Sequence, residues 1–412
     1  MLEHDVVIVG GGLVGGSLAC ALRDSGLSVV VVEAAPAGMP DHPSYDERVI
    51  ALSLGGRRIF EGIGIWEPMA ADAEPIRHVH VSDRGHFGFA HLDAEDEGVT
   101  SLGYVTPARA IGRGIETGLA QAQNVELLRP AQLVGLRATA EHWRLEVAVA
   151  GSSRLLQTRL LVAADGGNSA VRRRLGVGVH ERDYGYDAII STVTSERPRP
   201  GTAFERFTDS GPLAMLPMTG GRYSVVWTAR QGDTSGILAM NDDAFCANLQ
   251  QRFGQRLGRL DKPGRRIAYP LRQTMAKQLT RPRLALVGNA AHTLHPVAGQ
   301  GFNLGLRDVA ELAELLADAE RTGQDPGGNA VVGGYRKRRT PDQRGTALLT
   351  DALARLFVNP WAPIRLGRNL GMLGLDLVPS ARHLLAQRFM GTGGRQPRLA
   401  RGLPVASGRT DQ

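Results

Sequence analysis

Cysteine is scarce in this sequence: among 412 residues, only Cys20 and Cys246 are present. Two cysteines exclude a disulfide framework and a cysteine-rich metal site, and we expect no bound metal. The chain also lacks any uninterrupted run of about 18 apolar residues, so a transmembrane helix is not expected. Its N-terminus carries Glu3 and Asp5 and leads straight into an apolar strand, unlike a signal peptide. These features favour a cytoplasmic protein.

The net charge of +7 is unevenly distributed along the chain. Residues 335–412 carry 14 basic and 4 acidic side chains, a net charge of +10, which leaves −3 for the remainder. Basic segments face nucleic acid, anionic membrane surfaces or solvent. No nucleic-acid-binding module is recognisable and leucines are interspersed among the arginines, so we expect no nucleic-acid partner. Peripheral binding to the inner membrane and plain packing against the rest of the protein both remain open.

The chain is organised as two interleaved domains followed by a helical region. Buried-strand patterns indicate one discontinuous α/β domain, formed by residues 1–183 and 272–334. Between them, residues 184–271 show short alternating segments separated by Gly and Pro turns, which predicts an inserted antiparallel β-sheet domain. Residues 335–390 are predicted to be helical and residues 391–412 to be disordered. The fold class is therefore α/β, or α+β overall.

A glycine-rich turn follows the first expected strand, where residues 10–15 read Gly-Gly-Gly-Leu-Val-Gly and open a helix. This is the fingerprint of a dinucleotide-binding unit. Gly10 permits the tight turn, Gly12 lets a pyrophosphate approach the backbone, and Gly15 lets helix and strand pack closely. The helix N-terminus offers free N–H groups to phosphates. Glu33 closes the next strand 18 residues after Gly15, where an acid binds ribose hydroxyls.

Two later segments narrow the choice of dinucleotide. Each follows a buried strand, at the place where open α/β sheets bind ligands. The first begins with Asp165-Gly166, and the second begins with Gly288-Asn289 and continues into a second glycine-rich stretch at residues 298–303.

Together the three motifs resemble those of the FAD-dependent aromatic hydroxylase family, the group A flavoprotein monooxygenases with the p-hydroxybenzoate hydroxylase fold. The resemblance covers residues 5 to about 340 and includes residues 46–52, which match the family's flavin-contacting segment at Arg48. It implies a Rossmann-like FAD-binding domain with FAD as cofactor, NAD(P)H or another donor as reductant and O2 as co-substrate. The inserted sheet is then expected to close an apolar pocket against water.

The resemblance also narrows the subfamily. Where most of the family has Gly-Asp, this chain has Gly288-Asn289. Asparagine keeps an acceptor oxygen, so hydrogen bonds to the FAD ribityl group can survive without the charge. The residues around this pair, together with Phe204-Glu205-Arg206-Phe207-Thr208, are similar to the corresponding segments of the ubiquinone-biosynthesis hydroxylases, in particular the 2-polyprenyl-6-methoxyphenol hydroxylases.

That subfamily implies hydroxylation of the ring of a lipophilic polyprenylated phenol, 2-polyprenyl-6-methoxyphenol to the 1,4-benzoquinol, through a C4a-hydroperoxyflavin. A sister enzyme acting at another ring position or on a soluble aromatic is one alternative, and a non-catalytic prenyl-escort protein on the same fold is another. A flavin-dependent halogenase is not favoured, because none of the four tryptophans lies in a Trp-x-Trp-x-Ile-Pro motif. An association with other quinone-biosynthesis enzymes also stays open.

The resemblance assigns expected roles to individual residues. Pro296, Gly299, Gln300 and Gly301 are expected to position the flavin for catalysis, with no acid or base assigned. The residues expected to bind the cofactor are Gly10, Gly12, Leu13, Val14, Gly15, Glu33, Arg48, Arg109, Asp165, Gly166, Gly288, Asn289, Pro296, Gly299, Gly301, Phe302 and Asn303.

Several of these and neighbouring side chains have a second interpretation. Arg109 fits a cofactor contact and an exposed helix arginine about equally. His292 and His295 are better explained as hydrogen-bonded structural groups than as proton shuttles, and no third ligand accompanies them to bind a metal. Phe207 and Trp227 belong either to the substrate pocket or to the core of the sheet.

Overall fold

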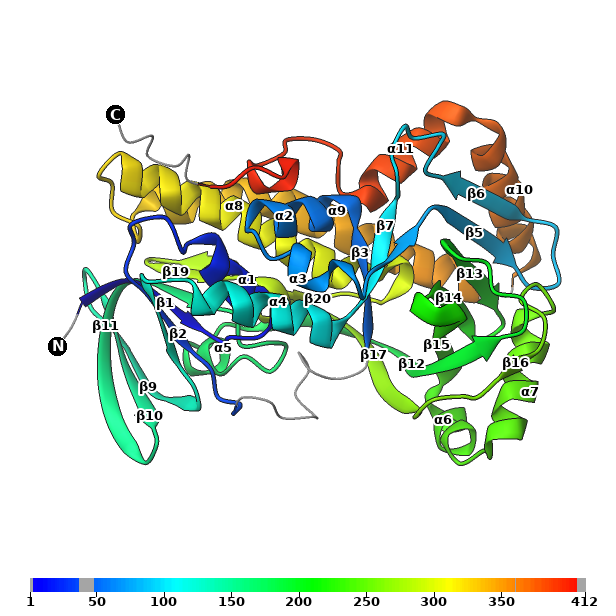
Figure 1. Ribbon diagram of the computed structural model, residues 1–412, viewed down its shortest axis with the longest axis horizontal. Helices are drawn as coiled ribbons and strands as arrows, with labels where there is room; N and C mark the ends of the chain where they lie inside the picture. The colour runs from blue at the N-terminus through cyan, green and yellow to red at the C-terminus, as the bar shows by residue number, and fades with distance from the viewer. Residues whose placement is uncertain (1–2, 37–47, 360, 406–412) are drawn as a thin grey trace.

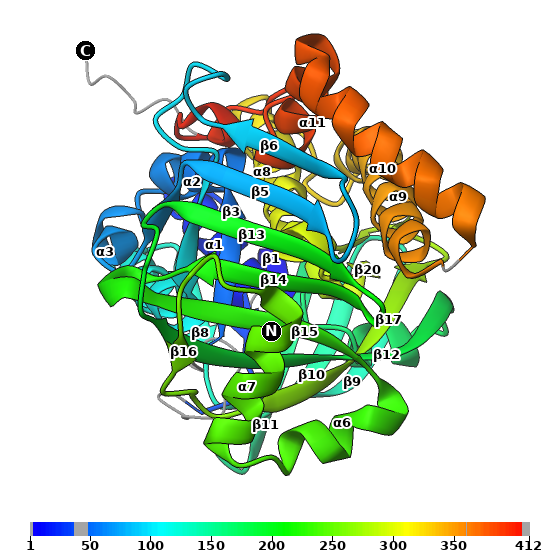
Figure 2. The same ribbon diagram turned by 90° about the vertical axis from the view of Figure 1, so that its right-hand side faces the viewer.

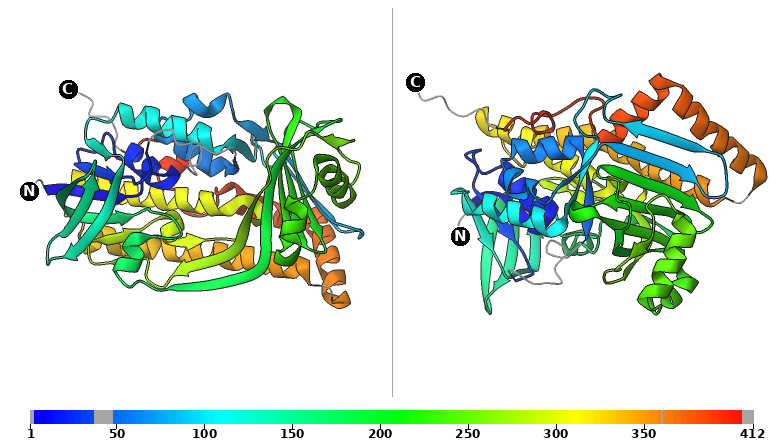
Figure 3. Two further views of the ribbon diagram at one scale, coloured as in Figure 1. Left: turned by 90° about the horizontal axis from the view of Figure 1, so that it is seen from below. Right: turned by 45° about the vertical axis from the view of Figure 1, so that its right-hand side comes forward.

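The computed structural model describes residues 3–36, 48–359 and 361–405. Two large sheets lie at opposite ends of the long axis, and long helices from the C-terminal third run alongside both (Figure 1). The first sheet has eight strands and the second has nine. The strands β12 and β17 run from the second sheet toward the first (Figure 3).

The first sheet has the parallel core expected of a Rossmann-like domain. Its strands, in spatial order, are β18 (Thr280–Arg281), β19 (Leu284–Leu286), β11 (Ser152–Ala163), β1 (Glu3–Val9), β2 (Val29–Val32) and β8 (Val125–Leu128). From β19 to β8 all neighbours are parallel, and β10 (Trp143–Val149) and β9 (Ala131–Ala138) extend β11 in antiparallel fashion. All four valines of β2 are buried, because both faces of the sheet are covered.

Helices and a small sheet complete the first domain. The helices are α1 (Leu13–Ala21), α2 (Leu54–Gly62), α3 (Glu67–Ala70), α4 (Ala108–Ala120), α5 (Ala170–Arg174) and α8 (Gln300–Arg321). Leu18, Ile115 and Leu312 bring α1, α4 and α8 into one buried cluster with β1 and β2. The small sheet has the order β3 (Val49–Ser53), β7 (Gly103–Pro107) and β4 (Glu74–Ile76).

The second sheet is mixed rather than purely antiparallel. Its order is β20 (His292–Thr293), β17 (Ile267–Ala276), β12 (Val179–Ser195), β15 (Arg222–Arg230), β14 (Gly211–Pro217), β13 (Thr202–Thr208), β5 (His78–Asp83) and β6 (Phe89–Asp93), with β16 (Leu260–Asp261) on β12 (Figure 2). The helices α6 (Gln231–Leu238) and α7 (Asp242–Phe253) cover its outer face, with Trp227 and Phe245 in the core between them.

Residues 184–271 therefore do not form the second sheet alone. The hairpin of β5 and β6 comes from the part of the chain that we assigned to the first domain, and β5 pairs with β13 in parallel. The paired residues are more than a hundred positions apart, as in Phe204 and His80. A pairing that distant leaves no local pattern in the sequence, since alternation shows only that a strand is half-buried.

The C-terminal third is helical, as predicted, although its first helix begins at Asn329 rather than at residue 335. It consists of α9 (Asn329–Val358), α10 (Ala362–Leu377) and α11 (Pro379–Met390). Three short 3-10 helices, η1 (Thr219–Gly221), η2 (Gly288–Ala290) and η3 (Val297–Gly299), lie in loops earlier in the chain.

The prediction of disorder from residue 391 is wrong for residues 391–405, while residues 406–412 lie outside the described residues. Leu399 and Ala400, in the 3-10 helix η4 (Leu399–Arg401), are buried in the main core against α2. The backbone N–H of Arg398 donates to Glu314 Oε2 at 2.7 Å. A polar composition predicted disorder here, but two apolar side chains and partners on α8 are enough to order the segment.

Candidate active site

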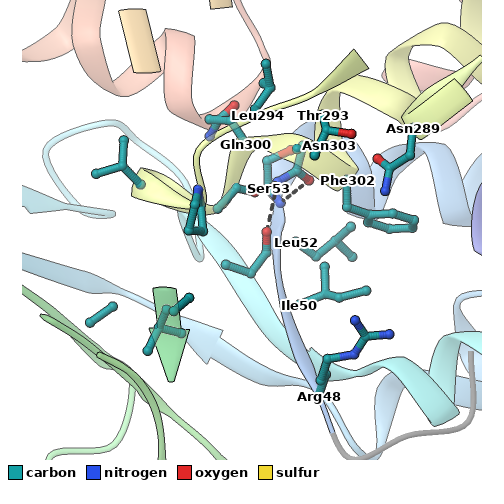
Figure 4. Close-up of a pocket in the computed structure, with 18 of the residues that line it drawn as sticks. Arg48, Ile50, Leu52, Ser53, Asn289, Thr293, Leu294, Gln300, Phe302 and Asn303 are labelled. Atoms are coloured by element: carbon teal, nitrogen blue, oxygen red, sulfur yellow. Dashed lines mark hydrogen bonds between the residues drawn. The ribbon is translucent and has the colours of Figure 1, made fainter. Parts of the chain in front are cut away.

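One cavity of about 1720 Å³ is lined by residues of both sheets and of the C-terminal helices. Typical pockets for drug-sized ligands measure roughly 300–1,000 Å³, so this cavity has room for a dinucleotide and a second molecule. Figure 4 shows part of its wall, with Arg48 and, from β3, Ile50 and Leu52 on the side opposite Phe302 and Asn289.

The glycine-rich turn between β1 and α1 forms one end of the cavity. Gly10 has φ +101°, and a Cβ there would lie 2.5 Å from the carbonyl oxygen of Ala164. A Cβ at Gly15 would lie 1.9 Å from the carbonyl oxygen of Gly10, so only glycine permits the turn to close onto the helix. Gly10, Gly12, Leu13 and Val14 line the cavity, whereas Gly15 is buried behind them.

Glu33 closes β2 beside this turn. One carboxylate oxygen of Glu33, Oε2, accepts a hydrogen bond from the backbone N–H of Gly11 at 2.6 Å, and Oε1 accepts one from Ala35 N at 2.8 Å. The side chain therefore fixes the glycine-rich turn, and it also lines the cavity where an adenosine ribose would lie.

Asp165 carries an oxygen that fits a cofactor hydroxyl. Its Oδ2 accepts a hydrogen bond from the backbone N–H of Val171 at 3.1 Å. Its Oδ1 is buried and accepts no hydrogen bond from any part of the chain that the structure describes. Asp165 and Gly166 both line the cavity, and a buried acceptor left without a donor is costly. A ribityl or ribose hydroxyl would satisfy it.

The turn at Gly288-Asn289 is held from behind by α8. Gly288 has φ +56°, and its N–H donates to Asp308 Oδ2 at 3.1 Å. The same carboxylate binds His292 Nε2 and Arg339 Nε, each at 2.7 Å. Burial alone would raise the pKa of Asp308, but Arg339 and His292 outweigh it and hold that pKa well below its usual range. Asn289 itself is exposed and lines the cavity (Figure 4).

The second glycine-rich segment forms the middle of the cavity wall. Pro296, Gly299, Gln300, Gly301, Phe302 and Asn303 all line it. A Cβ at Gly299 would lie 2.8 Å from the Cβ of Ala51, so this glycine lets the segment approach β3. A Cβ at Gly301 would meet no heavy atom within 4 Å, which leaves open space above the start of α8. An isoalloxazine ring placed there would lie at the N-terminus of α8, where the first N–H groups of a helix have no partner within the helix.

The side chain of Asn303 has a structural use that the sequence did not indicate. Its Nδ2 donates to the carbonyl oxygen of Ala51, and its Oδ1 accepts from the backbone N–H of Ser53, both at 2.8 Å (Figure 4). The amide therefore bridges α8 to β3. Residues 46–47 of the expected flavin-contacting segment lie outside the described residues.

Two of the histidines and Arg109 lie off the cavity surface. His295 is buried, and burial lowers its pKa to about 4, so the imidazole is neutral at pH 7. Its Nδ1 accepts a hydrogen bond from Val297 N at 3.2 Å. His292 is fully buried on Asp308, which favours the structural interpretation of both histidines. Arg109 is exposed and does not line the cavity. Gly288 does not line it either, because it is buried.

The outer part of the cavity lies between the second sheet and α9 to α11. Phe207 lines it, whereas Trp227 is buried in the core on the other side of the sheet. Two polar residues that line this part of the cavity were not predicted as site residues: Glu205 on β13 and Arg368 on α10. The alternation of Ala203, Glu205 and Phe207 along β13 carried a signal, since side chains two apart share one face.

The guanidinium of Arg368 forms an ion pair with Asp83. Its Nε and Nη2 bind Asp83 Oδ2 at 2.9 and 2.8 Å.

No group of three or more candidate metal ligands is found within residues 3–36, 48–359 and 361–405. In the same part of the chain, no helix has the length and apolar character needed to cross a bilayer.

Comparisons with known proteins agree with this site. The model of a family described as "FAD binding domain" matches residues 3–345. The crystal structure of p-nitrophenol 4-monooxygenase PnpA from Pseudomonas putida DLL-E4 superposes with a TM-score of 0.78 at 19% identity, covering 96% of this chain and 100% of that one. At that identity the likeness shows the fold. The chain belongs to the FAD-dependent aromatic hydroxylase family, with FAD as its cofactor.

Relatives in sequence define the subfamily. Ubiquinone hydroxylase UbiL of Rhodospirillum rubrum is 41% identical over 404 residues, covering 97% of this chain and 93% of the relative. The 3-demethoxyubiquinol 3-hydroxylase of Escherichia coli is 32% identical over 376 residues, covering 90% and 94%. Within its family, the protein is therefore a member of the ubiquinone-biosynthesis hydroxylases.

Proposed function

We propose that this protein hydroxylates the aromatic ring of a polyprenylated phenol on the route to ubiquinone. The observation that carries the proposal is the continuous cavity that joins the dinucleotide-binding turn to an apolar space between the second sheet and the C-terminal helices. When bound, FAD would supply the redox chemistry, namely reduction by a nicotinamide or another donor and activation of O2 so that one oxygen atom can reach the ring.

The residues of this chain bind and orient the cofactor and the substrate, and they exclude water from the site. The turn at residues 10–14 holds the pyrophosphate, and Asp165 and Asn289 bind sugar or ribityl hydroxyls. The N–H groups at the start of α8, from Gly299 to Phe302, stabilise the negative charge of the reduced ring without reorganising. Leucine, valine, phenylalanine and methionine side chains dominate the outer wall, which suits a reaction that water would divert.

The prenyl chain has an apolar path leading away from the flavin segment. Val81 and Ala90 of the second sheet pack with Met372 of α10, and all three line the outer cavity together with Leu375 of α10 and Phe389 of α11. We infer that the phenol ring lies near Pro296 and that the chain extends along this apolar wall. A soluble aromatic would leave this space unfilled.

We also propose which carbon of the phenol ring is hydroxylated. We expect hydroxylation para to the phenol, as in 2-polyprenyl-6-methoxyphenol hydroxylation. Supplying short-chain 2-prenyl-6-methoxyphenols with FAD, NAD(P)H and O2 and determining the product by NMR decides the position. A product hydroxylated elsewhere on the ring supports the sister-enzyme alternative. Turnover that does not depend on the presence of a prenyl chain supports a soluble substrate.

We further propose that the outer face of the C-terminal helices binds an anionic membrane surface, where such a phenol resides. Leu366, Leu370, Leu377 and Leu384 are between 54% and 78% exposed, an unusual density of exposed leucine on neighbouring helices. The other face of α10 lines the cavity through Ile364, Gly367, Gly371 and Met372. One helix would thus contact the bilayer outside and the prenyl chain inside.

Liposome flotation tests the membrane proposal. Removing the C-terminal helices by truncation after residue 340 would also disturb the active site, because Gln343 of α9 donates to Asp308 and Phe357 of α9 lines the cavity. Replacing Leu370 and Leu377 with glutamine changes only exposed side chains. We expect the wild type to float with vesicles containing anionic lipid and the double variant to remain in the soluble fraction with its FAD. A wild type that does not float contradicts the proposal. Association with other quinone-biosynthesis enzymes stays a separate proposal, which co-purification would test.

A further inference from the structure

A lone carboxyl lies in the middle of the apolar wall of the outer cavity. Glu205 on β13 is paired with Val81 on β5 and with Ala214 on β14. The same cross-strand row continues to Ala90 on one side and to Val226 on the other, and every one of these residues lines the cavity. Since residues paired across strands point to the same face, Glu205 is the single acid in a row of small apolar side chains.

The carboxylate of Glu205 has no hydrogen-bond or ion-pair partner within residues 3–36, 48–359 and 361–405. Enclosure by its apolar neighbours raises the pKa of Glu205 to about 7. Glu205 is half-buried among apolar side chains, where an ionised carboxyl without a partner is unfavourable, so a strongly perturbed one that lines a cleft indicates a functional group.

The neighbouring elements bring no charge to neutralise Glu205. β14 contains no ionisable side chain. On β5, His80 pairs with Phe204 and so lies on the opposite face of the sheet. Asp83, two residues beyond Val81 on the cavity face, is bound by Arg368 and by Asn369 Nδ2 at 3.0 Å. From α9, the side chains that line the cavity are those of Leu353, Leu356 and Phe357.

Glu205 shares a sheet face with a residue that packs against the flavin segment. Phe207, two residues along the same face of β13, packs with Val297, which directly follows Pro296. Phe357 of α9 stacks on Phe207 with ring centroids 3.3 Å apart and closes this side. A phenol ring placed against Pro296 therefore has Glu205 on the sheet that faces it.

We propose that Glu205 is a catalytic residue, the general base that accepts the proton of the substrate's phenol hydroxyl. This inference rests on the proposed function. The phenol O–H bond breaks, the proton goes to a carboxylate oxygen of Glu205, and the electron pair stays on the phenolate oxygen. No redox change occurs in this step. The phenolate delocalises negative charge onto the ortho and para carbons, which makes them better nucleophiles toward the oxygen that is transferred.

The chemistry of the carboxyl suits this role. A phenol has a pKa of about 10, so a carboxylate at the ordinary pKa of about 4 is a poor acceptor for its proton. General bases work best when their pKa lies near the operating pH, and enzymes raise that of glutamate by burial. Glu205 is already in that range, and the proton can leave to solvent when the product departs.

The test compares the FAD-loaded wild type with Glu205→Gln, which keeps the shape of the side chain but cannot ionise. Glu95→Gln, at an exposed turn, is the matched control. We expect Glu205→Gln to lower kcat for prenylphenol hydroxylation by about 10²- to 10⁴-fold, the usual contribution of a general base. FAD content and KM should change less than threefold. Consumption of reduced nicotinamide should continue, with hydrogen peroxide in place of hydroxylated product.

Two further readouts separate a base from a merely structural group. The wild-type hydroxylation rate should rise with pH through about 7, and Glu205→Gln should lose that inflection. A ring-fluorinated prenylphenol, assayed at a pH above its own lowered phenol pKa and therefore ionised without help, should recover most of the lost rate in the variant. A variant within threefold of wild type, or an equal loss on the fluorinated phenol, overturns the assignment of Glu205 alone. A wild type that hydroxylates no phenol overturns the proposed function and this inference with it.

Discussion

The backbone N–H of Gly288 donates a 3.1 Å hydrogen bond to the buried carboxylate of Asp308. An acid on α8 thereby determines the conformation of the turn that presents Asn289 to the cavity. Asp308 is in turn held by Arg339 and His292, so that a charge network behind the cavity wall supports the cofactor site in front of it. Such support does not touch the ligand but fixes the residues that do.

Replacing Asp308 with asparagine should therefore damage both stability and FAD binding. The variant leaves Arg339 buried without its main counter-charge, and breaking a buried pair in this way costs about 3–5 kcal/mol. We expect the free energy of unfolding to fall by that amount and FAD affinity to fall at least tenfold, measured by denaturant titration and by flavin fluorescence. Asp318→Asn, at the exposed end of α8, should change neither, because surface pairs contribute about 0–1 kcal/mol. Unchanged FAD affinity in Asp308→Asn would show that the turn does not depend on this bond.

The open space above Gly301 predicts a variant that folds but binds FAD poorly. A Cβ at this position meets no heavy atom within 4 Å, and its backbone is not in the left-handed region, so Gly301→Ala should fold normally. The added methyl group then occupies space expected for the flavin, and FAD affinity should fall at least tenfold. Gly232→Ala in α6 is the matched control, since its Cβ also meets open space. Equal FAD affinity in the two variants would place the flavin elsewhere in the cavity.

How far the sequence could predict this site depends on whether the information is local. The turn at residues 10–15 was predictable, because each glycine is required by contacts within one strand–turn–helix unit, as the 1.9 Å approach at Gly15 shows. The contribution of Asn303 to β3 was not, since the bond joins residues 250 positions apart. The β5–β6 hairpin was missed for the same reason. Glu205 looked like an ordinary polar residue on a strand, and only the sheet order shows that its neighbours are all apolar.

Asn289 offers a test of the departure from the family's Gly-Asp motif. The amide has an acceptor oxygen in common with a carboxylate, so Asn289→Asp should bind FAD within about threefold of wild type. The added negative charge should lower the reduction potential of the bound flavin, because the reduced ring is itself anionic. Asn289→Leu removes every hydrogen bond and should weaken FAD binding by about 1–3 kcal/mol. Fluorescence titration and a dye-coupled potential measurement check both. Full FAD affinity in Asn289→Leu would remove Asn289 from the cofactor contacts.

The carboxyl of Glu205 also makes the stability of the fold depend on pH. Its pKa is about 7 in the folded protein against 4.5 for an unperturbed glutamate, so between these values the folded state binds more protons than the unfolded state. Stability contributed by the neutral carboxyl is present below pH 4.5 and is lost as pH rises toward 7. Glutamine has no such loss. Glu205→Gln should therefore gain about 2–3 kcal/mol of stability relative to wild type between pH 5 and pH 8, since each pKa unit corresponds to about 1.4 kcal/mol. Denaturant titrations of both proteins at pH 5 and pH 8 measure this difference. A gap that is the same at the two pH values would mean that Glu205 ionises as freely in the folded cavity as in water, and it would remove the electrostatic basis for its role as a base.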